Sequence, residues 1–92
     1  MPYKISDYSY KQADKLGVTI KPSTQKGKKI DVFKQNQKIA SIGALGYKDF
    51  PTYLKQDGAA VANERRRLYK ARHQNDRTVK GSSGFYADRL LW

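Results

Sequence analysis

The sequence lacks cysteine and has a single histidine, His73, among its 92 residues. Without thiols there is no disulfide bond, zinc–thiolate site or thiol catalysis, and one imidazole cannot form a histidine metal cluster. No apolar run approaches the roughly 18 residues of a membrane span, and residues 1–10 lack the apolar core of a signal peptide. We therefore expect no cofactor, no membrane insertion and no secretion.

Acidic side chains are also scarce. Eight Asp and Glu residues oppose nineteen Lys and Arg residues, which gives a formal net charge of +11. Such a charge destabilises a small chain by self-repulsion unless an anion binds, and nucleic acid, an acidic protein surface and a lipid headgroup layer are candidates. A merely solubilising cationic surface is the alternative. Seven Tyr, three Phe and one Trp indicate a folded domain rather than a disordered basic tail.

Catalytic patterns are absent as well. The carboxylates are scattered, and no two of them have a spacing that indicates a metal nuclease. His73 and Asp76 are three residues apart, but a lone histidine at a polar helix end is more often a cap. Gly43 and Gly46 lack the spacing and the hydroxyl residue of a phosphate-binding P-loop. We do not expect an enzyme.

The first half of the chain predicts a short helix and three strands. Residues 6–16 begin with potential N-caps and end before a glycine. Residues 18–20 are a β-branched run that Pro22 stops, which is typical of a short edge strand. Two further strand-like runs, 29–33 and 38–42, flank a polar segment and indicate an antiparallel hairpin.

The hairpin also has a predicted register. A two-residue turn at 35–36 would place Val32 opposite Ile39. The same turn would place Ile30 opposite Ser41. Gln-Asn is a weaker turn signal than Asn-Gly, so this register depends on the turn forming as assumed.

The second half predicts helices. Asp49 and Pro51 indicate a helix start, and this short helix ends near Gly58. A long basic helix then runs from about Ala59 to His73. We therefore predict an α+β fold in one small basic domain: an antiparallel three-stranded meander covered by the basic helix, with short N- and C-terminal helices. Its predicted parts are an N-terminal extension (1–17), the meander (18–46), a helical region (47–77) and a loop with an apolar C-terminal segment (78–92).

Five of the six arginines lie between residues 63 and 77. A helical wheel centred on Leu68 gives a narrow seam, whose members are Val61, Glu64, Arg65, Leu68, Ala71 and Arg72, with Ala62 and Tyr69 at its edge. Arg65 and Arg72 border this seam, so we expect their stems to pack and serve the fold while their charged heads reach outward. The opposite side, which we expect to face solvent and to bind anions, carries Arg66, Arg67, Lys70 and Arg77.

The C-terminal residues Leu90, Leu91 and Trp92 end a largely apolar segment, 84–92. Chain ends are usually polar and frayed, so these side chains are expected to be buried. Two destinations stay open: the protein's own core, or a partner subunit through self-association.

Four strings follow one another between residue 18 and the C-terminus: KPSTQKGKK, ASIGALGYKDFPTY, ERRRLYKARH and GFYADRLLW. Together they resemble a family of small basic proteins of unknown function that large double-stranded DNA viruses of algae and amoebae encode, with relatives in some bacteriophages. The resemblance implies a viral origin and a place in the virion. It carries no established catalytic or binding residues, so none is transferred.

These observations lead to a functional hypothesis. We predict a virion-associated protein that binds nucleic acid, expected to be double-stranded DNA, through phosphate contacts without strong sequence specificity. The predicted contact residues are Lys28, Lys29, Arg65, Arg66, Arg67, Lys70, Arg72 and Arg77. The alternative is a minor capsid or core structural (cement) protein that binds acidic virion proteins. Either role places the protein in the virion or in the interior of the infected host cell.

Overall fold

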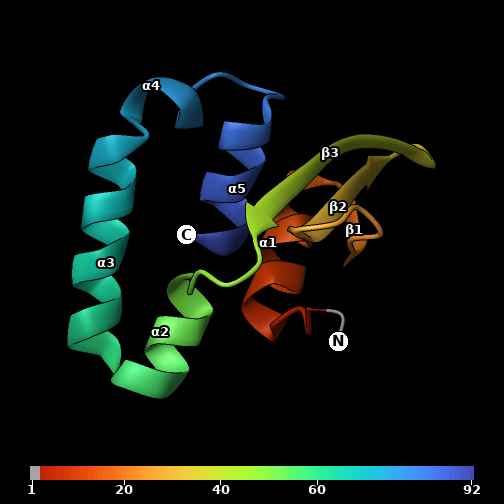
Figure 1. Ribbon diagram of the computed structural model, residues 1–92. Coiled ribbons are helices and arrows are strands. Elements are labelled where there is room, and N and C mark those ends of the chain that lie inside the picture. Colours follow the sequence, from red (N-terminus) through yellow and green to blue (C-terminus); the bar gives the residue numbers. More distant parts are fainter. Residues whose placement is uncertain (1–2) are drawn as a thin grey trace. The chain divides into compact units, whose positions relative to one another are not determined.

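A computed structural model describes residues 3–92, except for the side chain of Asp76 (Figure 1). Three antiparallel strands form one open sheet beside several helices, which confirms the predicted α+β class. In chain order the elements are α1 (Asp7–Leu16), β1 (Thr19–Pro22), β2 (Lys28–Lys34), β3 (Gln37–Ala44), α2 (Phe50–Asp57), α3 (Ala59–Arg72), α4 (Gln74–Arg77) and α5 (Ser83–Leu91).

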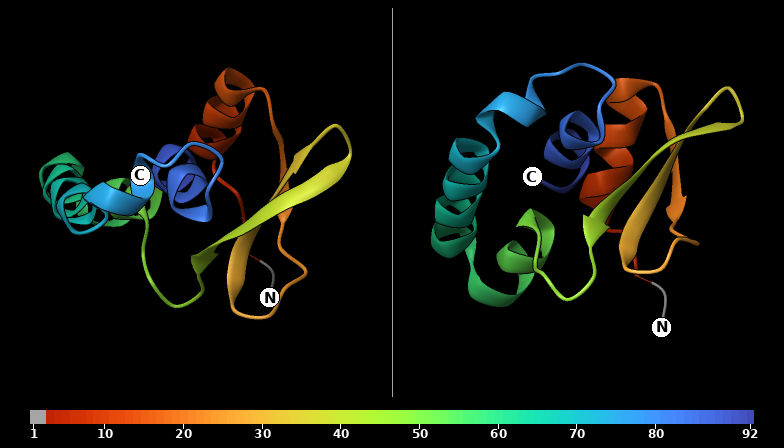
Figure 2. Two further views of the ribbon diagram at one scale, coloured as in Figure 1. Left: turned by 90° about the horizontal axis from the view of Figure 1, so that it is seen from above. Right: turned by 45° about the horizontal axis from the view of Figure 1, so that its top comes forward.

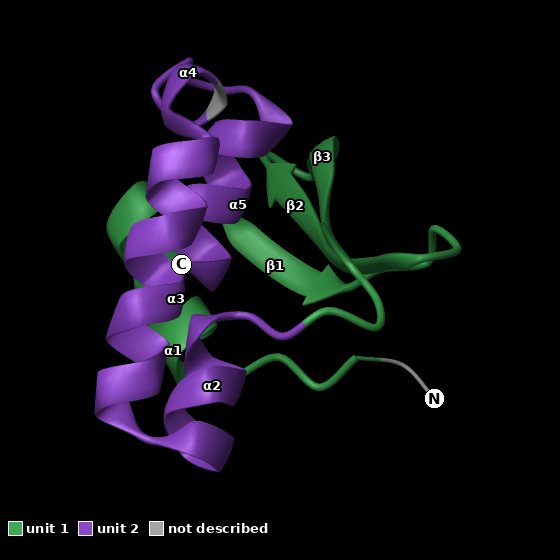
Figure 3. Ribbon diagram, turned by 60° about the vertical axis from the view of Figure 1, so that its left-hand side comes forward, with its two compact units in different colours: residues 1–47 green, residues 48–92 purple. Residues whose placement is uncertain are grey.

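The chain divides into two compact units, residues 1–47 and residues 48–92 (Figure 3). We call them the sheet unit and the helical unit. All three strands belong to the sheet unit, whereas the basic helix α3 belongs to the helical unit. The predicted covering of the sheet by the basic helix therefore stays a prediction, as does the single domain.

The sheet unit begins with α1, whose ends follow the sequence signals. The Ser6 hydroxyl accepts a hydrogen bond from the Ser9 amide at 3.2 Å and caps the first turn. Gly17 ends the helix in the left-handed conformation, with φ of 72°. Helix α1 contacts β1. The predicted N-terminal extension is thus part of the sheet unit.

The strands form the predicted meander, in the order β1-β2-β3, and lie side by side in both views of Figure 2. β1 is an edge strand, where Pro22 removes no hydrogen bond from the centre of the sheet. Gln35 and Asn36 connect β2 to β3 with φ of 52° and 64°. Two successive positive φ values are the signature of a type I′ hairpin turn, so the predicted two-residue turn is confirmed.

The predicted hairpin register is wrong beyond the first two pairs. Val32 lies opposite Ala40 rather than Ile39, because β3 contains a bulge where the register shifts. Ile39 is the extra residue, and 39% of its surface is exposed. The bulge brings Ala40 and Ile42 into the buried face. It thereby resolves a conflict in the sequence, since Ile39 and Ile42 cannot share one face of a regular strand.

One face of the sheet is apolar and buried. The side chain of Val32 in the central strand pairs with Ile20 on one side and with Ala40 on the other. Ile30 lies opposite Ile42, and both are buried. These cross-strand pairs bury methyl and methylene groups, which supplies the main stabilisation of the sheet unit.

In the helical unit, α2 and α3 form a pair of packed helices. The Asp49 carboxylate caps α2 by accepting hydrogen bonds from the amide and the hydroxyl of Thr52, at 3.1 and 2.6 Å. Gly58 separates the two helices with φ of 91°, a conformation that favours glycine. The chain then reverses through α4, so that α5 runs in the opposite direction to α3 (Figure 1).

The C-terminal segment is buried, as predicted. The α5 residues Leu90 and Leu91 are almost fully inaccessible to solvent. The Trp92 ring stacks on Tyr69 of α3, with the ring centroids 4.4 Å apart and the planes 10° from parallel. Burial of this segment thus needs no partner subunit, and self-association through it stays a prediction.

Candidate nucleic-acid interface

The orientation of α3 differs from the predicted seam. Ala62 is the buried residue of this helix, with 0% of its surface exposed, whereas Leu68 at the centre of the predicted seam is 38% exposed. Val61 is exposed as well. The side chains of Arg66 and Tyr69, which share a face with Ala62, are half-buried. The predicted division is therefore reversed for Arg65 and Arg72, which are exposed, and for Arg66, Lys70 and Arg77, which are half-buried. Arg67 is exposed, as predicted.

Arg66 holds α3 to α2 instead of facing solvent. Its guanidinium carbon lies 3.5 Å from the centroid of the Phe50 ring. A planar guanidinium at this distance stacks on the aromatic face, which combines cation–π attraction with apolar contact. Phe50 itself is buried. Arg66 is therefore part of the packing between the two helices rather than an open phosphate contact.

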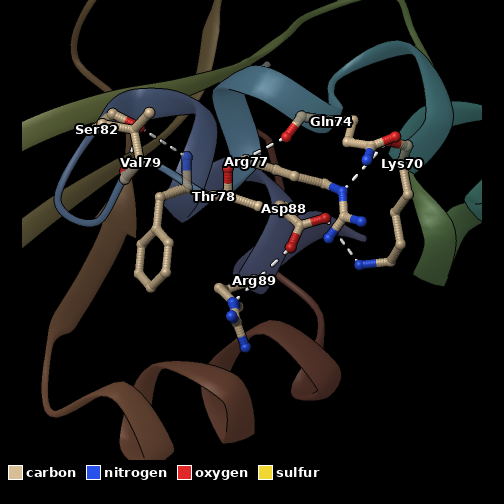
Figure 4. A network of polar contacts seen from close by, with 9 residues as sticks. Lys70, Gln74, Arg77, Thr78, Val79, Ser82, Asp88 and Arg89 are labelled. Atoms are coloured by element: carbon tan, nitrogen blue, oxygen red, sulfur yellow. Dashed lines mark hydrogen bonds and ion pairs between the residues drawn. The ribbon is translucent and has the colours of Figure 1, made fainter.

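Lys70 and Arg77 also contact other parts of the helical unit (Figure 4). The Lys70 ammonium pairs with the Asp88 carboxylate of α5 at 2.7 Å, and Asp88 is only 3% exposed. The Arg77 guanidinium donates from Nε to the Lys70 carbonyl oxygen at 3.2 Å. Arg89 approaches the same carboxylate at 3.8 Å. Lys70 therefore links α3 to α5, and Arg77 links α4 to α3.

Three of the predicted phosphate contacts are exposed: Arg65, Arg67 and Arg72. Arg67 forms a two-pronged pair with Glu64 one turn earlier, at 2.5 and 3.1 Å. The hydrogen bonds from Arg67 lower the pKa of Glu64, and the same pairing raises the pKa of Arg67. Because both side chains are exposed, water and salt weaken this pair, and a phosphate can compete for the guanidinium.

The two predicted contacts of the sheet unit have different surroundings. Lys28 is half-buried, whereas Lys29 is 4% exposed. The Lys29 ammonium donates to the Tyr47 carbonyl oxygen and lies 5.2 Å from the centroid of the Tyr3 ring. An ammonium held in this way does not reach a phosphate in solvent. The structure therefore argues against Lys29 as a contact residue.

Sequence reasoning did not assign a role to Asp31 at the centre of β2. Its carboxylate accepts hydrogen bonds from the hydroxyls of Ser23 and Ser41 at 2.6 and 2.7 Å, and from the Thr24 amide at 3.2 Å. Burial raises the pKa of Asp31, but these hydrogen bonds and the charge of Lys38 outweigh burial and hold it below the ordinary value of 3.8. The carboxylate ties the loop after β1 to the sheet.

Sequence reasoning also missed the residues on the sheet face opposite the apolar core. Asp31 and Phe33 alternate with the buried Ile30 and Val32, so they belong to this other face. The alternation is visible in the string KIDVFK and was the available signal. Phe33 is half-buried, with the Lys21 ammonium 5.4 Å from its ring centroid.

His73 has a structural position. It ends α3 as its C-cap, and its ring stacks on Tyr69 with the centroids 4.3 Å apart. Among the residues that the structure describes, no three His, Asp or Glu side chains are placed to hold a metal ion. In that same part of the chain, no helix has both the length and the apolar character needed to cross a membrane.

The fold and these side chains define a small, strongly basic α+β protein. Residues 18–53, from the start of the meander into α2, match the model of a family of unknown function (DUF5754). The family model covers less than half of the chain. The match agrees with the resemblance of the sequence to proteins of unknown function. No curated protein gives a significant match. No solved structure gives one either.

Proposed function

We propose that the protein binds nucleic acid through its phosphate backbone, with duplex DNA as the expected form and no strong sequence specificity. The observation that supports the proposal is the exposure of Arg65, Arg67 and Arg72 on one helix of a chain with a net charge of +11. A guanidinium presents a fork of donors that matches two phosphate oxygens. Each neutralised phosphate releases counterions, which drives binding without reading the bases.

Salt dependence tests this proposal. Fluorescence anisotropy with labelled duplex DNA should show binding at low salt, and the logarithm of the association constant should fall linearly with that of the salt concentration. Each neutralised phosphate contributes about 0.9 to the magnitude of this slope. The double variant Arg65→Gln/Arg72→Gln should make the slope shallower by the contribution of about two phosphate contacts.

The matched control is Lys11→Gln/Lys15→Gln, which removes the same charge from exposed positions on α1. It should leave the slope closer to that of the wild-type protein. Absence of binding at low salt, or binding that salt does not weaken, would contradict the proposal.

We also propose that the protein is of viral origin and resides in the virion. The support is the resemblance of four sequence strings to small basic viral proteins. An antibody against the protein should detect it in purified particles after external protein has been removed by protease. Detection only in infected cells, and never in particles, would contradict this location.

A second candidate is a cement protein of the capsid or core that binds acidic virion proteins. The specific observation in its favour is that Val61 and Leu68 are exposed on α3, on the same helix face as Arg65 and Arg72. Two apolar side chains at a spacing of seven residues lie on one helix face, and a phosphate backbone cannot cover them. Recovery with the shell after genome release would favour this role, whereas release with the genome would favour nucleic-acid binding.

A further inference from the structure

The face of the meander opposite Ile30 and Val32 carries apolar and cationic side chains at one end of the sheet. We call this group the sheet patch; its members are Lys21, Phe33 and Lys38, and Ile39 lies next to it in the chain at the bulge. Both lysines are exposed, Phe33 is half-buried and Ile39 is exposed. The patch lies entirely within the sheet unit and shares no residue with α3.

Backbone pairing fixes the position of the ring in the patch. Phe33 in the central strand lies opposite Thr19 of β1 and opposite Lys38 of β3. Strand alternation directs its side chain away from Ile30 and Val32 of the core. A half-buried aromatic ring on the face of the central strand opposite Ile30 and Val32 is thus bordered by a small residue and a lysine.

The surroundings of Phe33 show that a cation reaches its ring. The Lys21 ammonium lies 5.4 Å from the ring centroid. Because the lysine side chain is flexible, a planar group or another cation of a ligand can take its place on the ring. Phe33 has no polar atom of its own that would need a partner. Its exposed part therefore suits a flat, apolar surface.

The charge of the patch indicates the class of ligand. Asp31 is the one carboxylate within the three strands, and it is 2% exposed and held by Ser23, Ser41 and Thr24. The lysines thus meet no exposed acid within the strands. A ligand that combines flat rings with anionic groups complements both features of the patch.

We propose that the sheet patch binds single-stranded nucleic acid, with an unpaired base stacked on Phe33 and the adjacent phosphates near Lys21 and Lys38. A duplex keeps its base faces inside the stack, so it cannot offer one to Phe33, whereas a single strand can. The inference rests on the proposed function for the class of ligand. It adds a second site, on the sheet unit, that prefers single strands to duplexes.

Paired affinities test the site. The Phe33→Leu variant should bind oligothymidine about tenfold more weakly than the wild-type protein does, because a leucine provides no stacking surface. Its affinity for a DNA duplex of the same length should be unchanged. The Phe33→Tyr variant keeps the ring and should keep the affinity for the single strand.

The matched control is Tyr10→Leu, which removes an exposed aromatic ring of the same unit outside the patch. This variant should bind both ligands as the wild-type protein does. Equal losses in Phe33→Leu and Tyr10→Leu, or a loss in Phe33→Leu that is the same for both ligands, would overturn the inference.

Crosslinking of the wild-type protein makes the test independent of any folding defect in the variants. An oligonucleotide with 5-iodouracil should crosslink on irradiation to the tryptic peptide that spans residues 30–34. Crosslinks confined to residues 48–92 would overturn the inference while leaving the proposed function intact. Absence of binding to both single strand and duplex would instead reject the proposed function itself.

Discussion

The two units of the chain use their positive charge differently. The sheet unit has nine lysines and no arginine, whereas the helical unit has all six arginines and four lysines. Lys29 is the one lysine of the sheet unit that is buried. In the helical unit, Arg66, Lys70 and Arg77 contact a ring, a carboxylate or a carbonyl of another element. A high local density of cations therefore does not by itself mark a binding surface.

The difference follows from what each unit buries. On one face of its sheet, the sheet unit buries aliphatic side chains that lie opposite one another on neighbouring strands. Helix α3 buries only Ala62, so its packing depends on contacts that arginine can make and lysine makes poorly. Stacking of Arg66 on Phe50 is the clearest of them. Arginine in the helical unit is thus partly a packing residue.

The largest expected effect is in the helical unit. The Lys70→Met variant would leave the buried Asp88 carboxylate without its ammonium partner, with Arg89 the more distant cation. We expect a loss of about 2–3 kcal/mol in the free energy of unfolding, because an unpaired buried charge is costly. Urea denaturation measures it. A loss below that of the exposed-site control Lys80→Met would show that the pair does not hold α5.

The orientation of α3 is tested next. The Ala62→Leu variant adds methylene groups to a residue with no exposed surface and should cost about 2 kcal/mol through overpacking. The same change at the exposed Ala71 should have little effect. Thermal denaturation of both variants compares them. A larger loss of stability in Ala71→Leu than in Ala62→Leu would support the predicted seam, in which Leu68 faces inward.

A smaller effect is expected in the sheet unit from Asp31→Asn. The amide oxygen still accepts from Ser23 and Ser41, but it has lost the negative charge, so we expect a cost of about 1 kcal/mol at neutral pH. The pKa of Asp31 is lower in the folded state than its ordinary value of 3.8. The unfolded chain therefore binds the proton more readily, and the stabilisation is present above that value and is lost as the pH falls through the folded pKa.

Melting temperatures of wild type and Asp31→Asn as a function of pH measure this contribution. Their difference should be constant near neutral pH and should shrink below the ordinary carboxyl pKa. A difference that stays constant down to the lowest pH would mean that the Asp31 charge does not stabilise the fold.

The smallest effect is expected at the surface of α3. The Glu64→Gln variant removes the carboxylate that competes with phosphate for Arg67, so duplex affinity at low salt should rise by a small factor. The melting temperature should stay the same, because both side chains are exposed. Weaker binding in this variant would indicate that Glu64 positions the guanidinium for the ligand.

Local signals in the sequence predict the elements well. Ser6, Asp49 and the glycines after α1 and α2 mark helix ends through capping and positive φ. The β-branched runs and the polar turn predict the meander. Each of these signals acts over a few neighbouring residues, which explains why the elements and the α+β class agree with the structure.

Relations between elements were harder to predict. The bulge at Ile39 shifts the hairpin register, and a strict two-residue alternation cannot show it. The predicted orientation of α3 was wrong because the helical wheel ranked positions by apolarity. In the structure, Arg66 packs inward because its guanidinium stacks on the Phe50 ring. The buried Asp88, eighteen residues after Lys70 in the sequence, likewise fixes Lys70. Such pairings depend on tertiary contacts that periodicity does not contain.

The division of cations in the helical unit is tested most directly by two double variants that remove the same charge from α3. Arg65→Gln/Arg72→Gln should keep the wild-type melting temperature and should make the salt dependence of duplex binding shallower by about 0.9 per contact. Arg66→Gln/Lys70→Gln should lower the melting temperature clearly. Among molecules that remain folded, it should retain the wild-type salt slope. If Arg65→Gln/Arg72→Gln destabilises the protein and Arg66→Gln/Lys70→Gln loses the salt slope at an unchanged melting temperature, the division is contradicted.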